Sequence, residues 1–379
     1  MTEFQGKELA ETNSQESKKE TKSVLIPESR VLSDEKIWMG AASEFVDMLS
    51  YCRPAGSKTE RKFIAKFIIP LGVTFDKKGN YYKRVGVNPT ILWSSHTDTV
   101  HSIQGYQKIQ YWQDKRNDVH FEVNHKKTIG RKSSCLGADD TAGIWLMIEM
   151  IRANIPGLYI FHRAEEIGCL GSKHIAENNK DALKNIKFAI AFDRRDEKSI
   201  ITHQMSHRCC SDEFAESLAA QLGMGHEKDT TGSTTDTRSY VDLIAECTNI
   251  SVGYNNAHSS TENVNFDYLY RLRDAILKID ISKLVEKRKP GENTYLSRWA
   301  GGRSYGNYGG YYDADWHQDS IWSNTKSTHK KEDGVASTDL RKKYGTMDAW
   351  MEDYEWDYKF GLWFKKGAKT DEVDPAKKV

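Results

Sequence analysis

The chain has 379 residues, a formal net charge of +1 and a hydrophobic content of 38%. This length is sufficient for one large domain, or two smaller ones, with a buried core. The near-neutral charge provides no general attraction to nucleic acid or to an anionic membrane, so neither is expected as a partner. No apolar run is long enough to span a bilayer, and the N-terminal residues lack the hydrophobic segment of a signal peptide. We therefore expect a cytoplasmic protein.

The two ends of the chain differ in composition from the middle. Residues 1–35 are rich in Glu, Lys, Ser and Thr, and a segment of this kind buries too little apolar surface to offset its ordering entropy. It is predicted to be a disordered leader. Residues 289–379 are rich in Gly, Tyr, Trp and charged side chains. They predict an appendage that is part low-complexity linker and part short helical element. The globular domain is then expected to span 36–288.

Within that domain, short apolar runs alternate with segments of helical periodicity. Strands are predicted at 91–95, 157–162 and 187–192, and helices at 37–51, 141–155, 172–183, 211–223 and 266–285. Ser211 or Asp212 is the expected N-cap of the fourth helix. The polar segment 104–133 predicts one or two hairpins. Alternating strands and helices predict a sheet with parallel strands covered by helices. The six cysteines form no CxxC pair, so free thiols are expected.

Five polar clusters lie at the end of a predicted strand or in the loop that follows one. They contain, in chain order, His96 with Asp98, Asp139 with Asp140, Glu165 with Glu166, Asp193, and His258. Functional sites in open α/β sheets form outside the carboxyl ends of the strands, so these clusters should converge on one edge. Imidazole nitrogens and carboxylate oxygens are typical ligands of zinc. The number of carboxylates predicts two ions, with one carboxylate bridging them.

The motifs HTD, GADDTAG, AEEIG, a strand-terminal Asp and NAHSSTE, in this order, resemble those of the co-catalytic zinc exopeptidases of peptidase clan MH. That superfamily includes zinc aminopeptidases, tripeptide aminopeptidase, carboxypeptidase G and aminoacylases. The resemblance covers about residues 37–285. It implies a three-layer α/β sandwich with a mixed, mainly parallel central sheet flanked by helices. The interval 194–257 is too short for the lid domain that some members insert there, although the predicted hairpins at 104–133 are more typical of the lid-bearing branch.

The resemblance also implies a role for each motif residue. His96, Asp139, Glu166, Asp193 and His258 would hold two divalent ions, expected to be Zn²⁺ with Co²⁺ or Mn²⁺ as alternatives, and Asp139 would bridge them. Asp98 would hold the His96 ring by a hydrogen bond. Glu165 would be the general base that activates a metal-bridging water. The Asp139–Asp140 peptide bond would be cis.

The implied activity is hydrolysis of peptide bonds, as an aminopeptidase or dipeptidase. Three alternatives stay open: hydrolysis of another amide, such as an N-acyl amino acid or a cell-wall peptide, a non-catalytic binding protein on a peptidase fold, and cyclisation of N-terminal glutamine. Several other residues are each compatible with more than one role. Arg194 and Arg195 fit either a substrate carboxylate or surface salt bridges. Asp236 and Arg238 are candidate pocket residues, and His203 and His207 fit either the mouth of the site or a structural role.

Overall fold

The computed structural model describes residues 33–127, 133–291, 354–357 and 362–365. The predicted leader lies almost wholly outside these ranges, and so does most of the predicted appendage. The first helix, α1 (Ser33–Leu49), begins slightly before the predicted domain boundary. Within the appendage, β17 (Tyr354–Asp357) and β18 (Leu362–Lys365) form an antiparallel pair. The expected short helical element of the appendage lies outside the described residues. Within the described ranges, no helix is both long and apolar enough to cross a bilayer.

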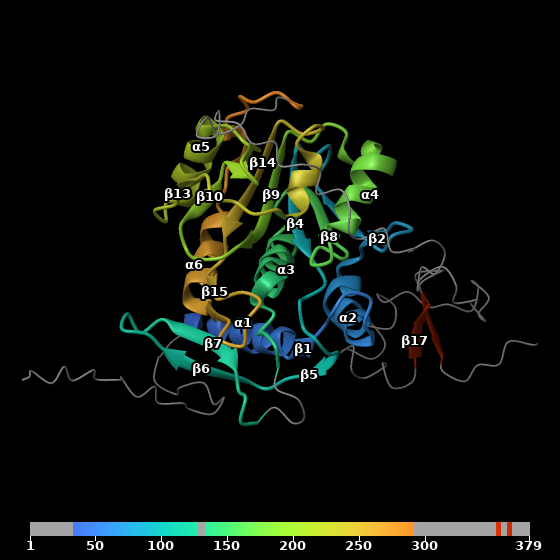
Figure 1. Ribbon diagram of the computed structural model, residues 1–379, viewed down its shortest axis with the longest axis vertical. Coiled ribbons are helices and arrows are strands. Elements are labelled where there is room, and N and C mark those ends of the chain that lie inside the picture. Colours follow the sequence, from blue (N-terminus) through green and yellow to red (C-terminus); the bar gives the residue numbers. More distant parts are fainter. Residues whose placement is uncertain (1–32, 128–132, 292–353, 358–361, 366–379) are drawn as a thin grey trace, which may run out of the picture.

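An eight-stranded mixed sheet forms the centre of the fold, in the order β13-β10-β14-β9-β4-β8-β3-β2 (Figure 1). Its four central strands run parallel to one another. They are β14 (Glu246–Ser251), β9 (Phe188–Arg194), β4 (Ile91–His96) and β8 (Gly157–His162). The outer strands are β13 (Glu227–Asp229), β10 (Ser199–Ile201), β3 (Tyr81–Val85) and β2 (Thr74–Phe75). The predicted strands at 91–95, 157–162 and 187–192 are therefore confirmed. The outer strands were not predicted.

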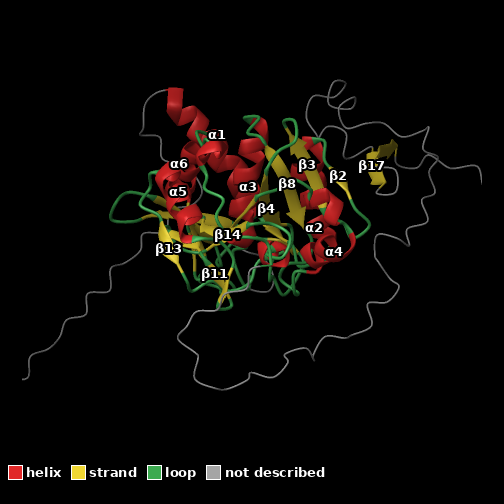
Figure 2. Cartoon of the chain, turned by 90° about the horizontal axis from the view of Figure 1, so that it is seen from above, coloured by secondary structure: helices red, strands yellow, loops and turns green. Residues whose placement is uncertain are grey.

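Alternate residues of each central strand enter two different cores, which makes the fold three-layered. Trp93 and Tyr159 belong to the larger core, whereas Leu92 and Ile160 belong to the smaller one. The larger core is covered by α1, α3 (Ala138–Arg152), α5 (Asp212–Leu222) and α6 (Phe266–Ile276). The smaller is covered by α4 (Leu170–Asn178) and the 3₁₀ turns η3 (Lys180–Leu183) and η4 (Asp236–Tyr240). Figure 2 shows α1, α3 and α6 together on one side of the strands. The predicted three-layer α/β sandwich is confirmed.

The predicted helices exist, with shifted ends. Ser211 caps α5, because its hydroxyl accepts a hydrogen bond from the Phe214 amide. The helix predicted at 172–183 divides into α4 and η3, and the one at 266–285 ends at Ile276, followed by the 3₁₀ turn η5 (Ile281–Lys283). Between α1 and β2 lie α2 (Lys58–Phe63), the π-helical η1 (Ile64–Ile68) and the 3₁₀ turn η2 (Ile69–Leu71).

The predicted hairpin region lies beside the main sheet. β6 (Ile109–Gln113) and β7 (Val119–Val123) form an antiparallel hairpin. β15 (Tyr254–Asn255) and β16 (Asn263–Asn265) complete a four-stranded sheet with it, and the loop between β15 and β16 carries His258. Two smaller pairs join β1 (Tyr51–Cys52) to β5 (Gly105–Tyr106), and β11 (His203–Gln204) to β12 (His207–Arg208). All six cysteines are buried and unpaired, as expected.

Helix α3 packs unusually close to the central strands, which places its first turn at their carboxyl ends. A Cβ atom on Gly143 would lie only 2.5 Å from the Phe192 carbonyl oxygen on β9, so the helix needs glycine at this contact. The Asp140 carboxylate accepts hydrogen bonds from the Gly143 amide and from the His96 amide at the end of β4. Asp140 therefore joins the start of α3 to the strand that carries the first predicted ligand.

Candidate active site

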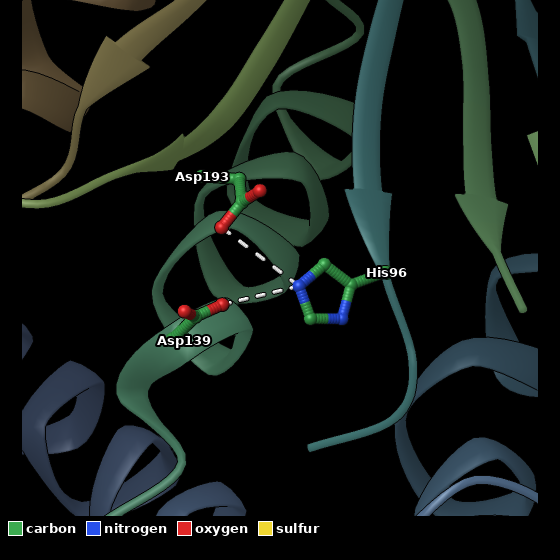
Figure 3. Close-up of side chains that lie close together, drawn as sticks. All are labelled: His96, Asp139 and Asp193. Carbon is green, nitrogen blue, oxygen red and sulfur yellow. Dashed lines mark hydrogen bonds and ion pairs between the residues drawn. The ribbon is translucent and has the colours of Figure 1, made fainter. Parts of the chain in front are cut away.

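The structure brings the five predicted metal-ligand residues together at the carboxyl edge of the sheet. They form two adjoining groups, each with ligand atoms within 4.8 Å of one another. The first is His96, Asp139 and Asp193, and the second is Asp139, Glu166 and His258. The first group comes from the end of β4, the first turn of α3 and β9, as Figure 3 shows. Convergence of the strand-end clusters follows from the parallel arrangement of β4, β8 and β9.

Asp139 belongs to both groups and presents a different oxygen to each. Its Oδ1 lies 3.1 Å from His96 Nε2, and its Oδ2 lies 3.1 Å from His258 Nε2. Asp193 Oδ1 lies 3.8 Å from His96 Nε2 on the first side. Glu166 Oε2 lies 3.2 Å from His258 Nε2 on the second side. One carboxylate thus faces two separate sets of donors, as a bridging ligand must.

The donor set fits divalent cations on chemical grounds. Burial, and then the nearby Asp139 carboxylate, raises the pKa of Asp193 to about 6 and the pKa of Glu166 to about 7. Glu166 Oε1 is also buried without a hydrogen-bond partner. Carboxylates crowded together at low exposure favour positive charge among them, because each destabilises the ionised form of the next. Imidazole and carboxylate donors without thiolates match zinc and similar borderline ions.

Glu165 lies beside the two groups without belonging to either. Burial is the main cause of its raised pKa of about 9, and the negative charges of Asp193, Asp236 and Glu166 raise the pKa further. The Cys169 thiol donates a hydrogen bond to Glu165 Oε1 over 3.3 Å. Bound cations would lower this pKa towards the neutral range. A carboxylate of this kind is suited to accept a proton and then release it.

Asp98 organises the turn that carries the two glutamates. Its two carboxylate oxygens accept hydrogen bonds from the amides of Glu165 and Glu166, at 3.1 and 3.2 Å. His96 Nδ1 lies 3.0 Å from the Asp98 carbonyl oxygen and 3.6 Å from the Asp98 carboxylate. The main chain of Asp98 therefore makes the shorter contact with the ring, while its side chain also positions the glutamates.

The sequence analysis did not identify a role for Glu262, although this residue is the last of the NAHSSTE motif. Its buried carboxylate accepts hydrogen bonds from the amides of Leu136, Gly137 and Asp139, at 2.8–3.1 Å. These contacts hold the loop before α3, including the cis Asp139–Asp140 peptide bond that the resemblance implies. Glu262 lies more than 120 positions along the chain from the amides that it binds, so spacing along the chain does not reveal these contacts. Thr235 and Tyr254 likewise donate to the two Asp193 oxygens, at 2.7 and 3.1 Å.

Replacing Glu262 with glutamine is expected to weaken metal binding about 10- to 100-fold. A glutamine must turn its NH₂ group towards at least one of the three amides, so at least one hydrogen bond is lost and the Asp139 loop shifts. Isothermal titration with Zn²⁺ measures the effect, with the exposed Glu216→Gln on α5 as the control. Equal zinc affinity in Glu262→Gln and the control would show that this carboxylate does not position Asp139.

Of the other candidate residues, some make contacts within the protein and one lines a cavity. Arg194 donates to Asp229 and Thr231, and Arg195 pairs with Asp196 on the surface, so both make protein contacts. His162 is buried against Tyr240, with its Nε2 2.7 Å from the Tyr240 hydroxyl oxygen. Asp236 is buried near His162, with 3.4 Å between its Oδ2 and His162 Nδ1. Arg238, by contrast, lines a cavity beside the glutamate turn.

A three-layer α/β fold with these donors at its carboxyl edge is typical of the metal-dependent hydrolases. The model of peptidase family M28 matches residues 80–279, which is more than half of the chain. The chain therefore belongs to peptidase family M28, and it is a metal-dependent peptidase. Among proteins with curated functions, none matches the chain.

Solved structures with the same fold include the aminopeptidase PepT of Bacillus cereus ATCC 10987 and a tripeptidase of Staphylococcus aureus subsp. aureus Mu50. Each matches with a TM-score of 0.50, and the identities are 15% and 14%. Both matches cover 64% of this chain and 97% of the other chain. At this identity the likeness establishes the fold.

Proposed function

We propose that this protein is an aminopeptidase that binds two zinc ions and removes N-terminal residues from short peptides. The observation that carries the proposal is the position of Asp139, which presents one oxygen to His96 and the other to His258. His96 and Asp193 would hold one ion with Asp139, and Glu166 and His258 would hold the other. The names of the two matched structures, an aminopeptidase and a tripeptidase, support an exopeptidase acting on short substrates.

When bound, the two ions would polarise the scissile carbonyl and lower the pKa of a water molecule. The chain's own residues would then carry the proton. Glu165 accepts it from the attacking water and delivers it to the nitrogen of the leaving amine. Asp98 holds the Glu165 amide, and Cys169 holds Glu165 Oε1, so the carboxylate is oriented before substrate arrives. Glu165 would therefore transfer the proton, while the neighbouring Glu166 would bind metal.

The same donors would also attack the carbonyl of another amide. Hydrolysis of N-acyl amino acids or cell-wall peptides is therefore the second candidate. No observation in the structure favours it over peptides, and a substrate panel separates the two. The metal-dependent site with its proton-transferring glutamate also favours a catalyst over a binding protein.

Removing the metal is expected to abolish hydrolysis reversibly. A chelator should reduce the release of N-terminal residues from tripeptides to background, because the carbonyl then loses its electrophilic partner. Adding Zn²⁺, Co²⁺ or Mn²⁺ should restore activity. Peptides and N-acetyl amino acids are assayed in parallel by chromatography of the products. Activity that persists in the dialysed, chelated protein would contradict the proposal, and faster cleavage of N-acetyl amino acids would support the second candidate.

A further inference from the structure

A cavity of about 640 Å³ lies between α4 and the segment 234–243, on the outer side of the glutamate turn. Its volume is within the range of about 300–1,000 Å³ that is common for small-ligand sites. Gly168 and Cys169 form one part of its wall, and Thr234 forms another. The remaining wall comes from α4, η3 and η4 and the residues that follow them.

The wall of the cavity is continuous with the catalytic centre. The Cys169 thiol donates to Glu165 Oε1, and the Gly168 amide donates to the Glu165 carbonyl oxygen. Thr234 precedes Thr235, whose hydroxyl donates to Asp193. A molecule in the cavity is therefore separated from both Glu165 and Asp193 by a single layer of residues. A peptide with its carbonyl at the metal centre would have to extend past Cys169 and Thr234 to reach this space.

Cationic side chains outnumber carboxylates in the wall of the cavity. Arg238, Lys173 and Lys180 line it, together with the carboxylates of Glu177 and Asp242. In the described part of the chain, none of the three cations forms an ion pair with a carboxylate. Arg238 is half-buried, whereas the two lysines are exposed. A half-buried guanidinium presents several donors in one plane, which matches the geometry of a carboxylate.

Two exposed aliphatic residues flank the wall residues Gly168 and Cys169 in the chain. Ile167, on the turn that carries the glutamates, and Leu170, the first residue of α4, are 53% and 45% exposed. They are among the large hydrophobic residues of the described chain that are most exposed. Aliphatic side chains beside a cationic cavity fit a ligand that is apolar along its length and anionic at one point. A short peptide with a carboxylate has this character.

We propose that the cavity between α4 and η4 is a substrate subsite that binds a carboxylate of the peptide, with Arg238 as its main partner. This inference rests on the proposed peptidase function. Two sources of the carboxylate share the same chemistry: the free C-terminus of a di- or tripeptide, and the side chain of an acidic residue. Lys173 and Lys180 add long-range attraction, while Arg238 supplies directed hydrogen bonds.

The test compares matched substrate pairs on the zinc-loaded enzyme. The first pair is Ala-Ala-Ala and its C-terminal amide, and the second is Glu-Ala-amide and Gln-Ala-amide. The value of kcat/KM should be about 10- to 100-fold higher for the carboxylate-bearing member of one pair, as expected for one lost charge-assisted hydrogen bond. Preference in the first pair identifies the C-terminal carboxylate as the ligand, and preference in the second identifies the acidic side chain.

Arg238→Gln should bring the two members of the preferred pair to within about twofold of each other. Lys180→Gln should reduce the preference partially, whereas Lys184→Gln, an exposed lysine in the same short segment that does not line the cavity, should leave it unchanged. No preference in either pair, or a preference that survives in Arg238→Gln, would overturn the proposal.

A binding measurement separates this proposal from the proposed function. In Glu165→Gln, calorimetric titration with Ala-Ala-Ala, its amide and the two dipeptide amides gives the same comparison without turnover. Lack of hydrolysis by the zinc-loaded wild type would contradict the peptidase function. Equal affinities within both pairs would contradict the carboxylate subsite, whether or not the wild type hydrolyses peptides.

Discussion

Replacing Glu165 with glutamine is expected to reduce kcat by about 10²- to 10⁴-fold while both metal ions stay bound. Glutamine has nearly the same size, and Glu165 belongs to neither group of converging donors. The amide cannot accept the proton of the attacking water, so turnover is lost without loss of the site. Steady-state kinetics with a tripeptide, together with elemental analysis of the dialysed protein, measures both quantities.

Glu166→Gln is the matched comparison, because it changes the next residue in the chain. Glu166 Oε2 lies 3.2 Å from His258 Nε2, so this variant should lose metal as well as activity. Comparison of the two variants therefore separates the effect on proton transfer from the effect on metal binding. If Glu165→Gln loses its metals while Glu166→Gln retains them, the roles of the two glutamates are the reverse of those proposed.

Replacing Asp139 with asparagine is expected to have the largest effect on the metal centre. The amide retains one oxygen, so it cannot supply an anionic oxygen to both the His96 side and the His258 side. We expect the affinity for at least one ion to fall by more than about 100-fold, the upper effect seen when only an outer partner of a ligand is removed. Hydrolysis should fall to background with it. Competitive zinc titration gives the affinities.

The control for Asp139 is another buried carboxylate at the same edge of the sheet. Asp236→Asn removes a negative charge that lies near His162 but belongs to neither group of donors. It should retain two equivalents of zinc. Two equivalents retained in Asp139→Asn would contradict the bridging role, and metal lost from both variants would indicate a general electrostatic effect.

The central strands and their terminal residues were predictable because both rest on local patterns. The apolar run 91–95 is buried on both faces and ends at His96. The run 187–192 likewise leads to Asp193. Parallel strands align their carboxyl ends, so residues far apart in the chain meet at one edge of the sheet. The donor residues could therefore be placed together from periodicity and motif order.

The contacts that orient these residues were not predictable from local patterns. Glu262 reaches the amides before Asp139, and Asp98 reaches the amides of two glutamates on another loop. Such bonds depend on tertiary placement, for which a single sequence has no signal. Arg238 was a candidate pocket residue, but its proximity to Lys173 was not predictable, because the two belong to different segments that packing brings together. Outer strands such as β3 are partly exposed, so they lack a strong apolar pattern.

The position of bound metal tests the central claim most directly. Crystals of the full chain grown with zinc should show two anomalous peaks at the zinc absorption edge, about 3.5–4 Å apart. One peak should lie between His96, Asp139 and Asp193, and the other between Asp139, Glu166 and His258. A single peak that does not contact Asp139, or peaks bound only by residues elsewhere in the fold, would contradict a two-metal site bridged by Asp139.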